Sequence, residues 1–115
     1  MRQSLVAEHR EIEAALDVLA DCVTSGAIEL DAVRRVQRLC AAHYEREESF
    51  LVRLPATLAA KLRGQHDEAL EIAARLEEAA MAGETRDAMY LARRLLAIAQ
   101  HNIIEEERDV FPRGE

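Results

Sequence analysis

Two short His-x-x-x-Glu segments contain the residues best suited to chemistry in this 115-residue chain. One runs from His43 to Glu47, the other runs from His101 to Glu105, and a second acid follows each glutamate. Residues four apart lie on the same face of an α-helix, one turn from each other. An imidazole and a carboxylate stacked in this way can both bind a metal ion at the centre of a helical bundle.

The chain has only two other histidines, His9 and His66, and each of them precedes one of these segments. The sequence therefore consists of two halves that each read His…His-x-x-x-Glu. Because there are only two copies, the pattern indicates a duplicated helical hairpin rather than a solenoid. Two hairpins related by a pseudo-twofold axis would bring both His-x-x-x-Glu helices to the same site from opposite sides.

All four histidines, together with Glu47 and Glu105, fall on apolar helical stripes. A single histidine on such a face is usually a core residue with a hydrogen-bond partner. A buried carboxylate without a partner costs several kcal/mol or takes up a proton, and two that face each other are worse. Imidazole with carboxylate and no thiolate suits iron, manganese or zinc. Because six ligands exceed the needs of one tetrahedral ion, the pattern predicts a site for two metal ions.

Composition and periodicity predict an all-α protein. Half of the residues are apolar, only 3% are aromatic, and apolar residues recur at three- and four-residue spacing. Helices are expected over residues 3–24, from Asp31 to Pro55, from Thr57 to Gly83 and from Thr85 to Pro112. With short loops they would form an antiparallel up-down-up-down four-helix bundle, as a single domain over residues 1–115. The histidines and glutamates would share one layer near the starts of the first and third helices.

Charge and hydropathy exclude several classes of partner. The net charge of −7 argues against nucleic acid, and no apolar run is long enough to span a membrane. The N-terminus is too polar for a signal peptide, so the expected location is cytoplasmic. Cys22 and Cys40 are expected to be buried thiols in a reducing compartment. Exposed apolar residues such as Val52 allow a homodimer, so the expected oligomeric state is a monomer or a homodimer.

The order His9, His43-x-x-x-Glu47, His66, His101-x-x-x-Glu105, followed by Phe111-Pro112, resembles the hemerythrin-like, or His-His-Glu cation-binding, domain over essentially the whole chain. The resemblance implies a non-haem di-iron centre of two Fe²⁺ or Fe³⁺ ions with an oxo or hydroxo bridge. It also implies a role for each residue. His9 and His43 would hold one iron, His66 and His101 would hold the other, and Glu47 and Glu105 would bridge them.

The chain departs from the oxygen-carrying members of that family at two positions. The carriers have a further histidine one turn after the first histidine of the third helix, and Leu70 stands there in this chain. The carriers also place the last acid five residues after its histidine, which is Glu106 here, whereas Glu105 matches the spacing of the broader family. Leu70 would leave one iron open to a small ligand, which favours redox chemistry over reversible carriage.

A few other residues near the motifs are weaker candidates for metal ligands. Glu13 lies one turn after His9, and Tyr44 directly follows His43, so these two are candidate additional ligands. Glu48 and Glu106 are expected to be surrounding or surface acids rather than ligands.

The leading functional hypothesis is a cytoplasmic di-iron protein that binds or reacts with dioxygen, peroxide or nitric oxide. If it is an enzyme, peroxide or nitric oxide turnover is the expected reaction. The alternative is an iron sensor or storage module without turnover, which acts through a partner protein or a change in oligomeric state. A third hypothesis is a bundle that binds zinc in the cell, and manganese is the remaining candidate metal.

Overall fold

The fold consists of four long helices, described over residues 2–113 by a computed structural model. The elements are α1 (Arg2–Ser25), α2 (Leu30–Leu51), α3 (Ala56–Met81), α4 (Thr85–Glu105), the π-helical turn η1 (Glu106–Val110) and the 3₁₀ turn η2 (Phe111–Arg113). No strand occurs in this part of the chain. The prediction of an all-α protein is therefore confirmed.

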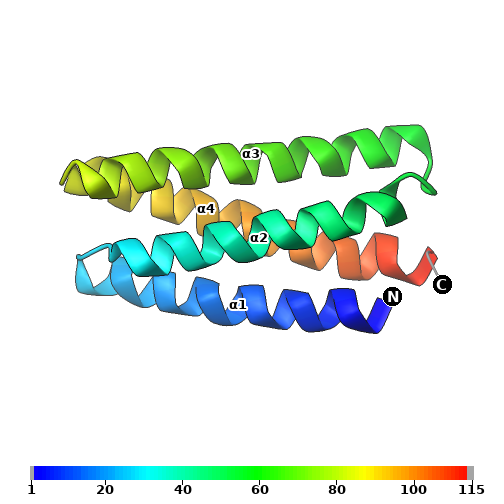
Figure 1. The fold of residues 1–115 in the computed structure, drawn as a ribbon, viewed down its shortest axis with the longest axis horizontal. Coiled ribbons are helices and arrows are strands. Elements are labelled where there is room, and N and C mark those ends of the chain that lie inside the picture. The colour runs from blue at the N-terminus through cyan, green and yellow to red at the C-terminus, as the bar shows by residue number, and fades with distance from the viewer. Residues whose placement is uncertain (1, 114–115) are drawn as a thin grey trace.

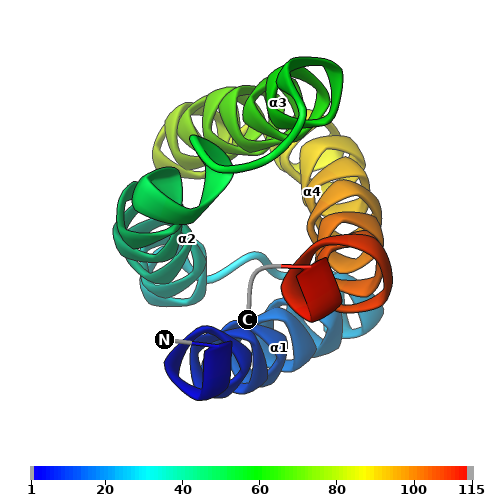
Figure 2. The ribbon, with the colours of Figure 1, turned by 90° about the vertical axis from the view of Figure 1, so that its right-hand side faces the viewer.

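Each helix runs antiparallel to the one before it, and α4 closes the bundle against α1 (Figures 1 and 2). The bundle measures 43 × 23 × 19 Å. The start of α1 and the end of α4 lie at the same end of its long axis (Figure 1). This is the predicted up-down-up-down arrangement. None of the helices among the described residues has the length and apolar character needed to cross a bilayer.

Short turns set the helix ends. Gly26 and Gly83 follow α1 and α3 with φ of 82° and 72°, a left-handed conformation that glycine adopts without the penalty of a Cβ. Pro55 precedes α3. The helix α2 was expected to begin at Asp31, which lies in its first turn, and Glu29 occupies the cap position without a side-chain hydrogen bond.

Buried apolar residues form two clusters along the bundle axis. The larger one fills the half that contains the α1–α2 and α3–α4 loops. The smaller one lies at the end with the termini and consists of Leu5, Phe50, Leu51, Leu62, Val110 and Phe111. Between the two clusters, α1, α2, α3 and the turn η1 that continues α4 each contribute at least one buried polar side chain: His9, His43, Glu47, His66 and Glu106. The core is thus interrupted by a single polar layer.

The inward face of α4 differs from the predicted stripe in its second half. After Leu95, the buried positions include Ala99 and Asn102, whereas Ile104 is 61% exposed and the side chain of His101 is 67% exposed. The small Ala99 side chain allows α4 to pack closely against its neighbours. An alanine is a weak signal in an apolar pattern, so the larger residues beside it set the predicted stripe.

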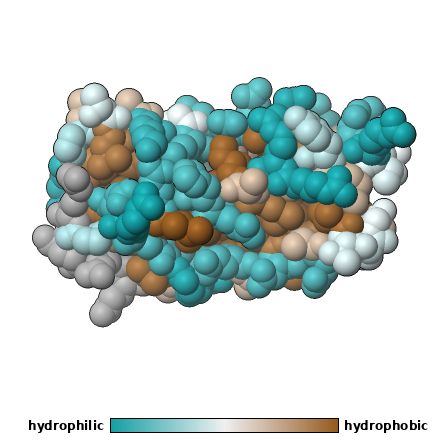
Figure 3. All heavy atoms as spheres, turned by 180° about the vertical axis from the view of Figure 1, so that it is seen from behind, coloured by the Kyte–Doolittle hydropathy of each residue, from teal (hydrophilic) through white to brown (hydrophobic). Residues whose placement is uncertain are grey.

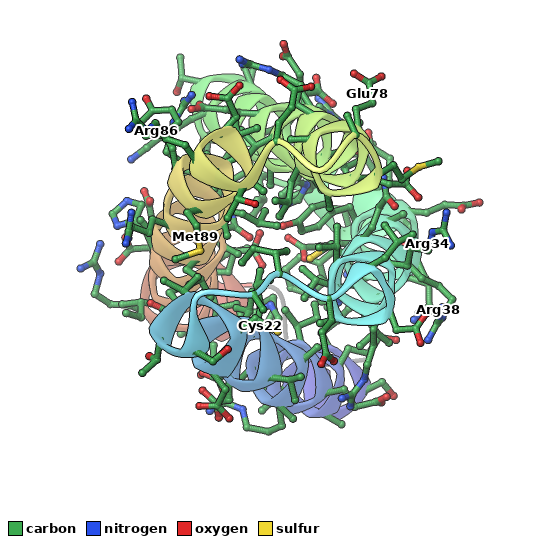
Figure 4. All side chains as sticks on the ribbon, turned by 90° about the vertical axis from the view of Figure 1, so that its left-hand side faces the viewer. Cys22, Arg34, Arg38, Glu78, Arg86 and Met89 are labelled. Atoms are coloured by element: carbon green, nitrogen blue, oxygen red, sulfur yellow. The ribbon has the colours of Figure 1, made fainter. Side chains whose placement is uncertain are left out.

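The outer surface is dominated by charged side chains. Figure 4 looks along the bundle from the end opposite the termini, and Arg34, Arg38, Glu78 and Arg86 point away from its axis there. Figure 3 shows a largely hydrophilic face with apolar side chains in separate patches. Val52 is 65% exposed, as expected.

Candidate metal centre

Four buried side chains from three elements converge in the polar layer. His9 on α1, His43 and Glu47 on α2, and Glu106 in η1 each present one potential ligand atom, and these atoms lie within 4.8 Å of one another. None of the four side chains is more than 1% exposed. His66 on α3 adjoins them, with its Nε2 atom 2.7 Å from Oε2 of Glu106. All four sides of the bundle therefore contribute to one cluster.

The two carboxylates each reach toward both sides of the cluster. Oε1 of Glu106 lies 3.0 Å from Nε2 of His9, while its Oε2 atom faces His66. Oε2 of Glu47 lies 2.8 Å from Nε2 of His43, while its Oε1 atom is 3.8 Å from Nε2 of His66. Each carboxylate thus has one oxygen toward the His9–His43 pair and one toward His66, which is the placement that a bridging carboxylate requires.

Three buried atoms of the cluster have no hydrogen-bond partner among residues 2–113. They are Nε2 of His43 and both carboxylate oxygens of Glu47. Although one of these oxygens lies 2.8 Å from Nε2 of His43, the two groups are not aligned for a hydrogen bond. Leaving buried polar groups unpaired is unfavourable, and an ionised carboxylate is the costliest case. A cation bound between these atoms would remove the cost, so the residues present fit a metal.

The pKa values within the cluster reflect two opposing effects. Burial lowers the pKa of His43, but the carboxylates of Glu106 and Glu47 outweigh burial and raise it to about 10. Burial raises the pKa of Glu47 to about 7, even though His43 opposes the shift. For Glu106, hydrogen bonds from the histidines overcome burial and hold the pKa well below its usual range. A proton on His43 therefore offsets part of the negative charge when no cation is bound.

Two of the histidines are held from outside the cluster by further glutamates. Nδ1 of His9 lies 2.8 Å from Oε2 of Glu107, and Nδ1 of His43 lies 2.6 Å from Oε1 of Glu8. Both imidazoles therefore turn Nε2 toward the centre of the bundle. The ring of Phe111 stacks on His9 with centroids 5.0 Å apart and covers the cluster on the side of the termini.

His66 is held in a different way. Its ring stacks on Tyr44 with a centroid distance of 3.8 Å and an interplanar angle of 6°. Tyr44 is buried, and burial together with the neighbouring Cys40 raises its pKa well above the usual value. The phenol therefore stays neutral at physiological pH. In the structure, the Tyr44 ring packs beside the cluster, against the imidazole of His66.

We expect Cys40 to resist alkylation while the protein is folded. Burial raises the pKa of its thiol to about 11, and Tyr44 opposes this shift only in part. Because the thiolate is the reactive form, iodoacetamide at pH 8 should modify Cys40 only after the protein has been unfolded. Mass spectrometry of the peptide that contains Cys40, with and without guanidinium, measures this. Labelling in the native protein at the rate of a free thiol would contradict the expectation.

The structure does not bring every candidate ligand to the cluster. The side chain of His101 points outward, with its Nε2 atom 3.1 Å from Oε2 of Glu105. Glu105 is buried, but its carboxylate pairs with Lys61 and accepts a hydrogen bond of 3.0 Å from Nε2 of Gln65. Glu13 is partly exposed and pairs with Arg10. These contacts place the His101–Glu105 pair on the flank of α4 that faces α3.

Glu106, which was expected to be a surrounding or surface acid, occupies the centre instead. It lies one turn beyond the buried Asn102, and it therefore shares the inward face of α4. The turn η1 begins at this residue, and π-helical turns of this kind often occur at functional sites. The one earlier signal for Glu106 came from the resemblance to the oxygen carriers, which place their last acid five residues after its histidine.

The comparisons with known proteins agree with this geometry. A family model described as the hemerythrin HHE cation-binding domain matches residues 1–114. Neither the curated proteins nor the solved structures with which the chain was compared include a significant match. The family model covers nearly the whole chain, and a buried cluster of histidines and glutamates suited to a cation lies at the centre of its four helices. The chain belongs to the hemerythrin HHE cation-binding domain family.

Proposed function

We propose that this protein holds two iron ions within its helical bundle and binds or reacts with a small ligand such as dioxygen, peroxide or nitric oxide. The observation that carries the proposal is the pair of buried carboxylates, Glu47 and Glu106, each directed toward imidazoles on two sides. Imidazole combined with carboxylate suits iron among the common metals, as well as zinc and manganese. The proposed cofactor is the one predicted from the sequence, whereas the proposed ligands include Glu106 in place of Glu105 and do not include His101.

His9 and His43 would hold one ion, His66 would hold the other, and Glu47 and Glu106 would lie between them. Glu106 would thus take the bridging role that the family resemblance implied for Glu105. A pair of non-haem iron ions supplies one-electron chemistry toward small oxidants. His66 is the single imidazole on its side of the cluster, so an ion held there would have room for a small ligand.

The packing around the polar layer determines how a small ligand can approach His66. The two apolar clusters close the polar layer on both sides along the bundle axis. Between α2 and α3, a surface groove of about 470 Å³ is lined by Tyr44, His66 and Leu70, among others. A small ligand can therefore approach His66 from the side of the bundle, along this partly apolar groove. The rest of the groove is open to solvent and is lined in part by charged side chains, so it admits small ligands, whereas Leu70 and Tyr44 belong to its apolar part.

The decisive experiment is to measure the metal content of protein purified without added metal, followed by absorption spectra. The expected result is two irons per chain and near-ultraviolet bands that change on exposure to dioxygen, peroxide or nitric oxide. Iron with a spectrum that ignores all three ligands would instead favour an iron sensor or store. Zinc alone would overturn the redox proposal.

Leu70 provides a direct test of the open position. It lies one turn after His66 and lines the same groove, so Leu70→His is expected to add an imidazole near the second ion. The spectrum of the iron-loaded variant should shift and its reaction with peroxide should slow, because a ligand site becomes occupied. Leu70→Met, which preserves the apolar volume, is the control and should behave like the parent protein. A parental spectrum and rate in Leu70→His would show that residue 70 does not face the metals.

A further inference from the structure

Glu8 and Glu107 form the same arrangement on two sides of the metal centre. Glu8 lies on α1 and binds His43 of α2, whereas Glu107 lies in η1 and binds His9 of α1. In both cases a glutamate oxygen is within 2.8 Å of the imidazole Nδ1 atom, the one that faces away from the carboxylates Glu47 and Glu106. Each contact therefore joins two different helices through a buried histidine.

An arginine completes each arrangement at the surface. Arg46 donates from Nε to Glu8, and Arg10 donates from Nη2 to Glu107. Both arginines are more than half exposed, both glutamates are partly buried, and both histidines are buried. The order from solvent to centre is thus Arg, Glu and His in each case. An arginine that neutralises the outer carboxylate stabilises it in a partly buried position.

The positions of these glutamates in the chain explain how they arise. Glu8 directly precedes His9, and Glu107 directly follows Glu106, so each is adjacent to a proposed ligand. Neighbouring residues on a helix are about 100° apart around its axis. A residue next to an inward ligand therefore lies at the edge of the inward face, where it can reach the ligand of an adjacent helix.

We propose that Glu8 and Glu107 are positioning residues, which hold His43 and His9 with Nε2 toward the bridging carboxylates and make the His9–His43 position the tighter of the two metal positions. A carboxylate bound to Nδ1–H fixes the orientation of a ligand imidazole and increases the basicity of its Nε2 atom. His66 is held by stacking on Tyr44, which orients the ring without that electronic effect. The two ions should consequently bind in order, with the His9–His43 position first. This inference rests on the proposed function.

The test combines metal titration with a measurement on metal-free protein. Anaerobic calorimetric titration with Fe²⁺ is expected to show two steps in the parent protein. Glu8→Gln and Glu107→Gln should weaken the first step roughly 10- to 100-fold and change the second step less. Glu11→Gln, at an exposed position of α1, is the matched control and should leave both steps unchanged. Thermal melting of each metal-free variant shows that it is folded.

Proton NMR of the metal-free protein tests the contacts of Glu8 and Glu107 with the histidines independently of metal binding. Two protected imidazole Nδ1–H resonances are expected far downfield, one lost in Glu8→Gln and the other in Glu107→Gln. If these resonances behave as expected but the parent binds no metal, the proposed function fails and the inference fails with it. If the parent binds two ions and both variants keep its affinities, the inference is overturned while the proposed function stands. Equal affinity of the two steps in the parent also contradicts the proposed order.

Discussion

Replacing Glu106 with alanine is expected to abolish metal binding and to destabilise the metal-free protein. The Glu106 carboxylate is fully buried and lies within 3.0 Å of Nε2 of both His9 and His66. Its removal leaves these two buried nitrogens without that partner and takes away one of the two groups that reach both proposed metal positions. Breaking a buried ionic interaction in this way costs about 3–5 kcal/mol. Metal analysis and urea unfolding of the metal-free protein measure the two effects.

The neighbouring residue Glu105 provides a stringent control. Its carboxylate pairs with Lys61 and Gln65 on the flank of α4, so Glu105→Ala should keep the full metal content. The expected loss of stability is about 1–3 kcal/mol, because the partner Gln65 is only partly buried and Lys61 is exposed. The reverse outcome, with metal lost in Glu105→Ala and kept in Glu106→Ala, would contradict the assignment of Glu106.

Glu106→Gln distinguishes the effect of charge from the effect of shape. Glutamine has nearly the same volume and keeps hydrogen-bonding atoms beside the histidines, so the metal-free variant should be less destabilised than Glu106→Ala. It lacks the negative charge that a bridging ligand supplies, so iron binding should still be strongly weakened. Parental iron affinity in Glu106→Gln would mean that Glu106 organises the histidines without binding the metal.

Periodicity predicted the fold because it reports directly on the burial of helix faces. The stripe on α2 contains large apolar residues on both sides of His43 and Glu47, and both residues are buried in the structure. On α4, His101 and Glu105 have the same four-residue spacing and form an equally regular pair. The spacing establishes that its two members share a face of the helix. It does not establish which face points toward the core.

The choice of Glu106 depends on packing between helices. It is the middle residue of three consecutive glutamates, a run that in sequence resembles a solvated acidic segment. Its burial follows from the phase of α4, which is set by small residues such as Ala92 and Ala99 in contact with the core. The contacts of Glu8 and Glu107 with histidines on other helices likewise require the relative heights of the helices. None of these quantities can be read from the spacing of residues within one helix.

Opposite effects on iron content are expected when His66 and His101 are each replaced with alanine. Nε2 of His66 lies 2.7 Å from Glu106, so His66→Ala should lose about one of two irons and the reaction with peroxide. The imidazole of His101 is 67% exposed on the outside of α4, so His101→Ala should keep both irons and the spectrum of the parent protein. Iron analysis of both variants, together with absorption spectra after addition of peroxide, measures the difference. If His101→Ala loses one iron as well, α4 must turn when metal binds so that His101 faces inward, and the ligand set predicted from the sequence would then apply. Equal iron losses in the two variants would therefore mean that His101 is exposed only in the metal-free bundle. An iron loss confined to His66→Ala would mean that His66 is the single imidazole at the second metal position, which leaves that position open to small ligands.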